Sequence, residues 1–235
     1  MRLIVLGSGT CVPSLTRNAP GYYLYAEGMH VLVDCGSGTL LQLERAGKSY
    51  RDIDAVFITH THPDHISDIV PLIHALMATP GFGRTRKLSI IGPQGTRRYY
   101  DECVMVLLKR PKTFDVDVIE IEGKLDMGPF FVFAGRTVHS DNSIAYRFED
   151  EGKSVVITGD CDYDGKLVDF ARGADLLIAD CSFPDKMKVS GHMIPKECGL
   201  LAKNAGVKKL VLSHIYSALS PDEERIAESR AVFDG

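Results

Sequence analysis

Short apolar runs bounded by turn residues recur along the whole chain and predict a series of β-strands. The expected strands are Leu3–Leu6, Tyr22–Ala26, Val31–Asp34, Ala55–Thr59, Leu88–Ile91, Val116–Ile121, Phe130–Phe133, Ser143–Phe148, Ser154–Thr158, Asp175–Ala179 and Lys209–Ser213. Segments with helical spacing alternate with these runs in the early and late thirds of the chain. The pattern therefore predicts an α/β (α+β) protein whose middle is rich in strands.

Several helical segments begin with proline, which the first position of a helix tolerates because its missing N–H has no intrahelical partner there. The expected helices are Gly38–Ala46, Pro63–Met77, Pro93–Leu108, Gly165–Ala171, Pro195–Ala205 and Pro221–Val232. In the second of these, apolar residues from Ile66 to Met77 keep the spacing of a face that packs inward. Pro71 is expected to kink or interrupt that helix.

Length and composition are those of one globular domain. The 235 residues are 45% hydrophobic and 25% charged, which is enough to bury a full core. No repeat or long Ser/Gly linker divides them, so we expect a single domain over residues 1–235. No apolar run approaches the roughly 18 residues of a membrane helix, and no signal-peptide pattern follows Met1. The expected location is the cytoplasm, without a membrane partner.

Neither the charge nor the cysteines indicate a specialised class of protein. The formal net charge of −4 provides no basic field for a large nucleic acid. Basic clusters at Arg84–Lys87, Arg97–Arg98 and Lys109–Lys112 are interpreted as solvated faces. The six cysteines form no CxxC pair, so we expect them to be reduced and buried.

The strongest chemical signal is the segment Thr-His-Thr-His-Pro-Asp-His at residues 59–65, directly after an apolar strand. In an extended stretch His60 and His62 point the same way and can bind one ion. Asp64 and His65, adjacent at a helix start, leave the backbone in different directions and can reach a second ion. Any one of these residues alone would be interpreted as a solvated loop residue, but together they indicate a metal site.

Three further candidate ligands, His139, Asp160 and His214, each follow an apolar run, where side chains from different strands can meet. Imidazole and carboxylate suit Zn²⁺ best, with Mn²⁺ or Fe²⁺ as alternatives. A site with few protein ligands leaves room for water, as catalytic sites do. The sequence therefore predicts an enzyme, a metal-dependent hydrolase.

The order of these residues resembles the metallo-β-lactamase superfamily, whose pattern is HxHxDH, a distant His, an Asp after Thr-Gly, and a final His. The resemblance spans nearly the whole chain and implies a four-layer αββα sandwich with two divalent metal ions. It implies that His60, His62 and His139 hold the first ion and that Asp64, His65 and His214 hold the second. It also implies that Asp160 bridges the two ions, and that Asp34 orients ligands without itself binding a metal ion.

Two such ions lower the pKa of a bridging water and yield a hydroxide nucleophile, a chemistry that serves phosphodiesters, lactones and thioesters alike. Asp64 is expected to act as a catalytic residue too, by orienting that water and accepting its proton. The segments Leu6–Ser14 and Asp34–Thr39, with Arg17-Asn18, resemble the phosphodiesterase branch that contains RNase Z. This resemblance favours attack on phosphorus.

His192, in Ser190–Glu197, resembles the histidine of that branch that contacts the scissile phosphate or protonates the leaving group, a catalytic role suited to imidazole. Met193 departs from the small hydroxyl residue usual at the next position, and a structural role for His192 stays open. The tRNA-processing members carry a long arm between the positions that match His139 and Asp160. Here only residues 140–159 intervene, and their turn, Glu149–Gly152, is acidic.

We therefore expect a binuclear phosphodiesterase that acts on a small or cyclic phosphodiester. An RNase Z-like tRNA 3′-processing endonuclease is the first alternative, with RNA as the less favoured substrate. A lactone or thioester hydrolase and a non-catalytic binding protein on the same fold are the others, and the complete ligand set disfavours the last. The sequence leaves open the physiological substrate, the resident metal and whether the chain forms a homodimer.

Overall fold

Each of two units in this chain folds around its own six-stranded sheet. The computed structural model describes residues 1–235. Unit 1 comprises Met1–Gly7 and Asn18–Ile121, and unit 2 comprises Ser8–Arg17 and Glu122–Gly235. Every helix in both units is too short or too polar to cross a membrane.

The sheet of unit 1 places the ends of its parallel strands at one edge. Its strands, in spatial order, are β1 (Arg2–Gly7), β2 (Gly21–Ala26), β3 (Met29–Cys35), β4 (Ala55–Phe57), β5 (Leu88–Gly92) and β6 (Val116–Glu120). The pairs among β1, β2 and β3 are antiparallel, and those from β3 to β6 are parallel. Val33 of β3 pairs with Phe57 of β4, so Asp34 and the segment that begins at Ile58 lie at the same edge.

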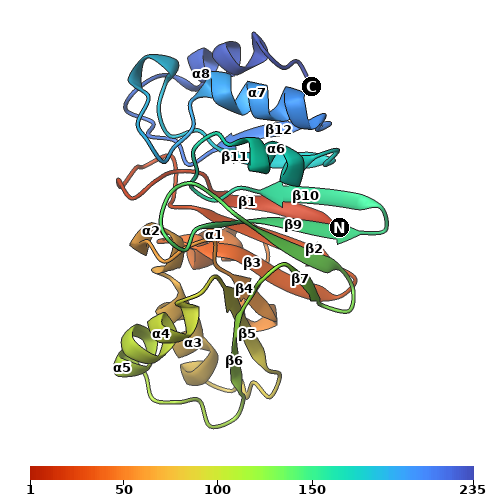
Figure 1. Cartoon of the computed structure of the whole chain (residues 1–235). Coiled ribbons are helices and arrows are strands. Elements are labelled where there is room, and N and C mark those ends of the chain that lie inside the picture. The colour runs from red at the N-terminus through yellow and green to blue at the C-terminus, as the bar shows by residue number, and fades with distance from the viewer. The chain divides into compact units, whose positions relative to one another are not determined.

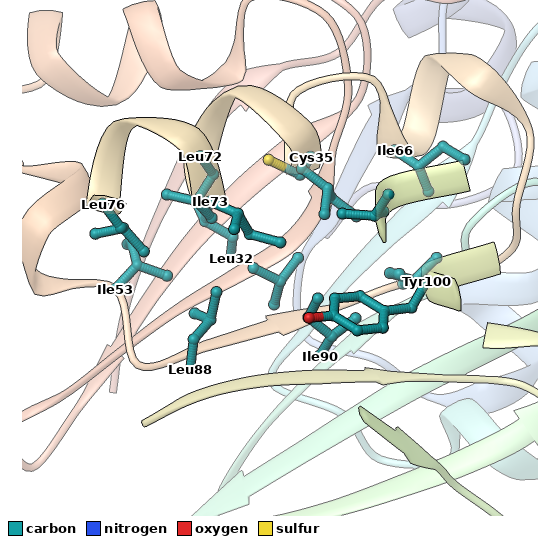
Figure 2. Packing of buried hydrophobic residues seen from close by; sticks show 14 of the residues in the cluster. Leu32, Cys35, Ile53, Ile66, Leu72, Ile73, Leu76, Leu88, Ile90 and Tyr100 are labelled. Carbon is teal, nitrogen blue, oxygen red and sulfur yellow. The ribbon is translucent and has the colours of Figure 1, made fainter. Parts of the chain in front are cut away.

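The helices of unit 1 connect these strands and cover the sheet. They are α1 (Thr39–Arg45), the 3₁₀ helix η1 (Tyr50–Asp52), α2 (Pro63–Ile66), α3 (Ile69–Ala78), α4 (Thr96–Tyr99), the π-helix η2 (Tyr100–Val104) and α5 (Met105–Leu107). Figure 2 shows Leu72, Ile73 and Leu76 of α3 directed toward apolar side chains of the strands, including Leu88 and Ile90. This buried cluster holds α3 on the sheet, because removing so many apolar groups from water is strongly favourable.

The expected helix Pro63–Met77 is two helices, and the break lies earlier than Pro71. Ser67 and Asp68 separate α2 from α3. Pro71 is the third residue of α3, where its missing N–H has no intrahelical acceptor to lose. The backbone N–H of Asp68 instead donates to the carbonyl of Cys35 (2.8 Å). The prediction of an interruption is confirmed, but its position is wrong by three to four residues.

The sheet of unit 2 has an antiparallel half and a parallel half. Its strands are β7 (Lys124–Asp126), β8 (Phe131–Arg136), β9 (Ile144–Asp150), β10 (Lys153–Ile157), β11 (Leu176–Asp180) and β12 (Leu210–Ser213). Strands β7 to β10 form antiparallel pairs in sequence order, whereas β10, β11 and β12 run parallel. Asp180 pairs with Ser213 in the last of these pairs, so the segments after β11 and β12 begin side by side.

Helices lie against the parallel half of this sheet (Figure 1). They are α6 (Gly165–Ala171), the 3₁₀ helix η3 (Asp185–Met187), α7 (Pro195–Ala205) and α8 (Asp222–Arg230). Leu201, Ala202 and Ala205 of α7 are buried with Leu177 and Ala179 of β11. Figure 1 shows α7 and α8 side by side at the C-terminal end of the chain.

Strands β9 and β10 form a tight hairpin, as expected from the sequence. Its two central residues, Glu151 and Gly152, have positive φ angles of 48° and 74°, which are typical of a type I′ turn. Nothing longer than this hairpin and its flanking loops separates His139 from Asp160.

Two expectations about single side chains need correction. Cys11 and Cys103 are exposed, whereas the other four cysteines are free and buried as expected. Arg84 is not part of a solvated basic face, because its exposed fraction is 2%. Its guanidinium donates to the backbone carbonyls of Arg51, Ile53, Arg86 and Lys87.

Candidate metal centre

In unit 1, the segment after β4 brings two imidazole nitrogens together. Nε2 of His60 and Nδ1 of His62 are 3.0 Å apart, as expected from the i, i+2 spacing in an extended backbone. His60 is fully buried, and His62, immediately before α2, is exposed. Two nitrogens that bind one tetrahedral Zn²⁺ lie about 3.3 Å apart, so this spacing fits ligands of a single cation.

A buried aspartate orients the next histidine. Oδ2 of Asp34 lies 2.8 Å from Nδ1 of His65, and Oδ1 accepts a hydrogen bond from the backbone N–H of Thr59 (2.8 Å). The hydroxyl of Thr59 also lies within hydrogen-bond distance of both carboxylate oxygens. This network fixes His65 with Nδ1 as the donor, so that Nε2 presents its lone pair, the arrangement that metal-binding histidines use.

Asp64 lies beside that lone pair at the start of α2. Its Oδ2 is 3.7 Å from Nε2 of His65. The backbone carbonyl of Asp64 approaches Gly36 so closely that a Cβ on Gly36 would stand 1.9 Å from the oxygen. Glycine at this position therefore allows α2 to start where it does, with the carboxylate of Asp64 near Nε2 of His65.

In unit 2, a carboxylate lies between two imidazoles. Oδ2 of Asp160 is 3.2 Å from Nε2 of His214 and 3.7 Å from Nε2 of His139. Nδ1 of His139 donates to the carbonyl of Gly191 (3.0 Å), and Nδ1 of His214 lies 2.8 Å from the hydroxyl of Ser182. Both histidines thus direct Nε2 toward the same carboxylate oxygen, as two ligands of bridged cations would.

His192 belongs to the same group of side chains. Its ring stacks on that of His214, with centroids 5.5 Å apart and an interplanar angle of 7°, and meets the ring of His139 edge-on at 4.8 Å. Its Nδ1 lies 2.8 Å from Oδ2 of Asp180. Asp160, His192 and His214 each place one ligand atom within 4.8 Å of the others.

Asp180 and Ser182 are functional candidates that sequence reasoning missed. Oδ1 of Asp180 accepts from the hydroxyl of Ser182 (2.6 Å), and that hydroxyl lies within reach of Nδ1 of both His192 and His214. Both residues are buried. Asp180 ends the apolar strand β11, as Asp160 follows β10, so the rule that found Asp160 also applies to Asp180.

A lysine holds the loop that carries His192. Nζ of Lys188 donates to the carboxylates of Asp162 and Glu197 and to the backbone carbonyl of His192 (2.7 Å). Asp162 in turn accepts from the backbone N–H of Gly191 (3.0 Å). These bonds tie residues 188–192 to the segment after Asp160 and to the start of α7.

The donor set in each unit fits a divalent cation of intermediate hardness, because it consists of imidazoles and carboxylates. Burial raises the pKa of the Cys161 thiol well above its usual value, and the same holds for Cys198. Both thiols therefore pack as small apolar groups.

Comparison with known proteins gives a consistent set of relatives. The model of the beta-lactamase superfamily domain matches residues 29–215. The probable metallo-hydrolase YhfI of Bacillus subtilis is 31% identical, with 100% of this chain and 95% of that protein covered. The structure of YhfI, described as a metallo-beta-lactamase fold protein, superposes with a TM-score of 0.87 at 29% identity, over 99% of this chain and 92% of that chain.

Ribonuclease Z proteins are also similar. That of Archaeoglobus fulgidus is 28% identical, over 99% of this chain and 93% of that protein. Human tRNase Z, short form, superposes with a TM-score of 0.81 at 28% identity, over 94% of this chain and 95% of that chain. The alignment with the Archaeoglobus protein runs over 290 positions, against 238 for YhfI. The ribonuclease therefore contains residues that have no counterpart among the 235 of this chain.

Proposed function

Because the chain belongs to the beta-lactamase superfamily and is a metal-dependent hydrolase, we propose that it is a binuclear phosphodiesterase that cleaves a small or cyclic phosphodiester. The observation that carries the proposal is the short hairpin between His139 and Asp160, in a chain otherwise similar to ribonuclease Z over its whole length. Without a long arm, the chain has no extended basic element there to hold the body of an RNA.

The proposal assigns every expected ligand to an ion. His60, His62 and His139 would hold the first, Asp64, His65 and His214 would hold the second, and Asp160 would be shared between them. Support comes from the geometry within each unit: paired nitrogens in unit 1, and a carboxylate flanked by two Nε2 atoms in unit 2. Zn²⁺ is the proposed metal on the chemistry of the donors, with Mn²⁺ or Fe²⁺ as alternatives. When bound, the ions supply an activated water and neutralise charge on the phosphate.

The protein side chains then position and move protons. Asp64 orients the attacking water and accepts its proton. His192 acts as an imidazolium: Nδ1–H stays bonded to the carboxylate of Asp180, and Nε2 gives its proton to the leaving oxygen, which leaves the ring neutral. Asp34 keeps His65 in one tautomer through the bond to Nδ1.

Activity against a panel of substrates tests the proposal. We expect the purified, metal-loaded protein to hydrolyse bis(p-nitrophenyl) phosphate and a cyclic phosphodiester faster than a lactone or a thioester. His62→Ala should abolish this activity without unfolding the chain. His74→Ala is the matched control, since His74 is exposed on α3 and outside the metal centre. A preference for the acyl substrates, or full activity in His62→Ala, would contradict the proposal.

Processing of tRNA 3′ ends is the second candidate, favoured by the similarity to proteins named ribonuclease Z. It requires that RNA be held by a surface other than the arm. Cleavage of a tRNA precursor at a rate above that of the cyclic phosphodiester, under the same metal conditions, would establish this candidate in place of the first.

Two further measurements determine the metal content and the oligomeric state of the protein. Metal analysis of the purified protein should find two equivalents of a divalent ion, with zinc in excess over manganese and iron. Native mass determination in dilute solution decides whether the chain forms a homodimer, which would have twice the 25.8 kDa of one chain.

A further inference from the structure

Arg225, on α8, is a fully buried cation that binds two loops of unit 2. Its exposed fraction is 0%. One terminal nitrogen donates to the carbonyls of Cys181 (3.0 Å) and Ser182 (3.4 Å), and the other donates to the carbonyl of Tyr216 (3.1 Å). All three acceptors are backbone carbonyls, and Nε makes no hydrogen bond.

The two loops follow β11 and β12 and carry His192 and His214, two of the candidate side chains in unit 2. Ser182 follows β11 and lies within hydrogen-bond distance of Nδ1 of both His192 and His214. Tyr216 is two residues beyond His214, whose φ of 56° lies in a region that non-glycine residues seldom adopt. Arg225 thus holds the backbone on each side of the hydrogen bond between Ser182 and His214: at Ser182 itself, and at Tyr216, two residues after His214.

The chemistry of this contact is specific to arginine. The planar guanidinium presents donors in a rigid fork, so one side chain reaches acceptors on two segments at once. An ammonium group is a point charge with no such fork. A buried cation is also expensive where packing alone is needed, because an apolar side chain of similar volume would fill the space at no desolvation penalty.

We propose that Arg225 is a positioning residue: it holds the loops after β11 and β12 together, and so keeps the Ser182 hydroxyl where it fixes the rings of His192 and His214. The expected effect on catalysis rests on the function proposed above. The expected effect on the orientation of the two imidazoles is independent of that function.

A neighbouring cavity makes the proposal testable by chemical rescue. A cavity of about 290 Å³ is lined by Arg225 together with Leu212, Ile226 and Phe233. A small cation in solution can therefore reach the space that a shortened side chain at position 225 would vacate. Guanidinium has the shape and the donors of the group that is lost, whereas ammonium has only the charge.

The experiment compares Arg225→Ala and Arg225→Lys with the wild type and with Arg84→Ala. Arg84 is the matched control, because it is also a buried arginine that donates to backbone carbonyls, but of residues in unit 1 that carry no proposed ligand. The readouts are kcat and KM on bis(p-nitrophenyl) phosphate, zinc affinity by competition with a chromophoric chelator, and the imidazole N–H proton signals of His192 and His214.

We expect Arg225→Ala to lower kcat and zinc affinity by about 10- to 100-fold, the range seen when a partner of a metal ligand is removed, with little change in KM. The imidazole signals should broaden or shift, and millimolar guanidinium should restore part of kcat where ammonium does not. Arg225→Lys should fold and retain the charge, yet keep the defect. Arg84→Ala should lower the midpoint of thermal unfolding without changing the other readouts.

Wild-type imidazole signals and zinc affinity in Arg225→Ala or Arg225→Lys would overturn the proposal, as would an equal loss in Arg84→Ala. If the wild type hydrolyses no phosphodiester, the function proposed above fails while the imidazole signals still decide the role of Arg225. If Arg225→Ala does not fold, the same measurements on Arg225→Lys decide it.

Discussion

At the scale of single residues, Asp34 orients the candidate metal ligands of unit 1 through its bonds to Thr59 and His65. It is buried, adopts a left-handed backbone with φ of 54°, and binds Thr59 and His65. An asparagine in its place would keep the backbone, because asparagine tolerates this conformation, but would offer only one acceptor oxygen. We expect Asp34→Asn to weaken metal binding by about 10- to 100-fold, measured by chelator competition. Unchanged affinity, with the protein folded, would remove Asp34 from the set of orienting residues.

The candidate ligands were predictable because chemistry-bearing residues follow apolar strands, a pattern visible in the sequence at His60, His139, Asp160 and His214. The groups that hold these ligands were less predictable. Ser182 contacts two histidines through loop geometry that no periodicity encodes. That these residues bind metal stays a prediction, supported by the arrangement of their donor atoms within each unit.

At the scale of elements, the start of α2 depends on Gly36. A Cβ there would collide with the carbonyl of Asp64 at 1.9 Å, so Gly36→Ala must displace α2 or β3. We expect a loss of about 1–3 kcal/mol in the free energy of unfolding, typical of overpacking, measured by urea denaturation. Gly83→Ala is the control, since a Cβ at Gly83 meets nothing within 4 Å. Equal stability of the two variants would show that α2 can move freely.

Asp175 connects the three parallel strands of unit 2 at the ends where these strands begin. It precedes β11 and contacts residues at the starts of β10 and β12. Its carboxylate accepts from Nζ of Lys208 (2.7 Å) and from the backbone N–H of Ser154 (2.9 Å). The bond from Lys208, followed by that from Ser154, lowers the pKa of Asp175 to about 2.

A carboxyl with a lowered pKa stabilises the fold above the pKa of the unfolded chain, near 3.9, and loses that effect as the pH falls through the folded value. The wild type should therefore exceed Asp175→Asn in free energy of unfolding by on the order of 1 kcal/mol at neutral pH. The difference should shrink from about pH 4 downward. Urea unfolding at pH 7, 5, 4 and 3 would check this, and a difference that grows toward acid would have the wrong sign.

Most strands could be predicted because each is an apolar run bounded by turn residues. Each expected strand is present within a few residues of its expected bounds. The strand β7 was missed because Lys124-Leu-Asp126 is short, polar and largely exposed, and pairs only with β8. The break before α3 was misplaced because the bond from Asp68 to Cys35, a contact distant in sequence, decides it.

At the scale of the whole molecule, the metallo-β-lactamase fold expected from the resemblance is confirmed by the superposition on YhfI. A resemblance in motif order could predict this because the ligand positions are spaced by whole strands and helices. The resemblance also implied two related halves, whereas the residues that belong to each of the two units are decided by contacts between distant segments. A single domain over residues 1–235 stays a prediction, and one transition in calorimetry would support it.

Each unit has an apolar core that includes none of the proposed ligands. We therefore expect the protein to stay folded when metal is removed, unlike a zinc finger. Treatment with EDTA should leave the far-UV circular dichroism unchanged at 25 °C and lower the midpoint of thermal unfolding. Restored Zn²⁺ at 100 times the Kd of a site should add about 2.7 kcal/mol per site to the free energy of unfolding. Collapse of the dichroism in EDTA would mean that metal builds the fold.

The position of Arg225 has a consequence for how a minimal version of this protein should be defined. The family match ends at residue 215, and α8 begins at Asp222. A truncated chain that stops at the homology boundary would keep all seven proposed ligands. It would nevertheless lack the guanidinium that binds the loops of Ser182 and His214. The residues needed for a correctly arranged site would therefore extend beyond the end of the family match.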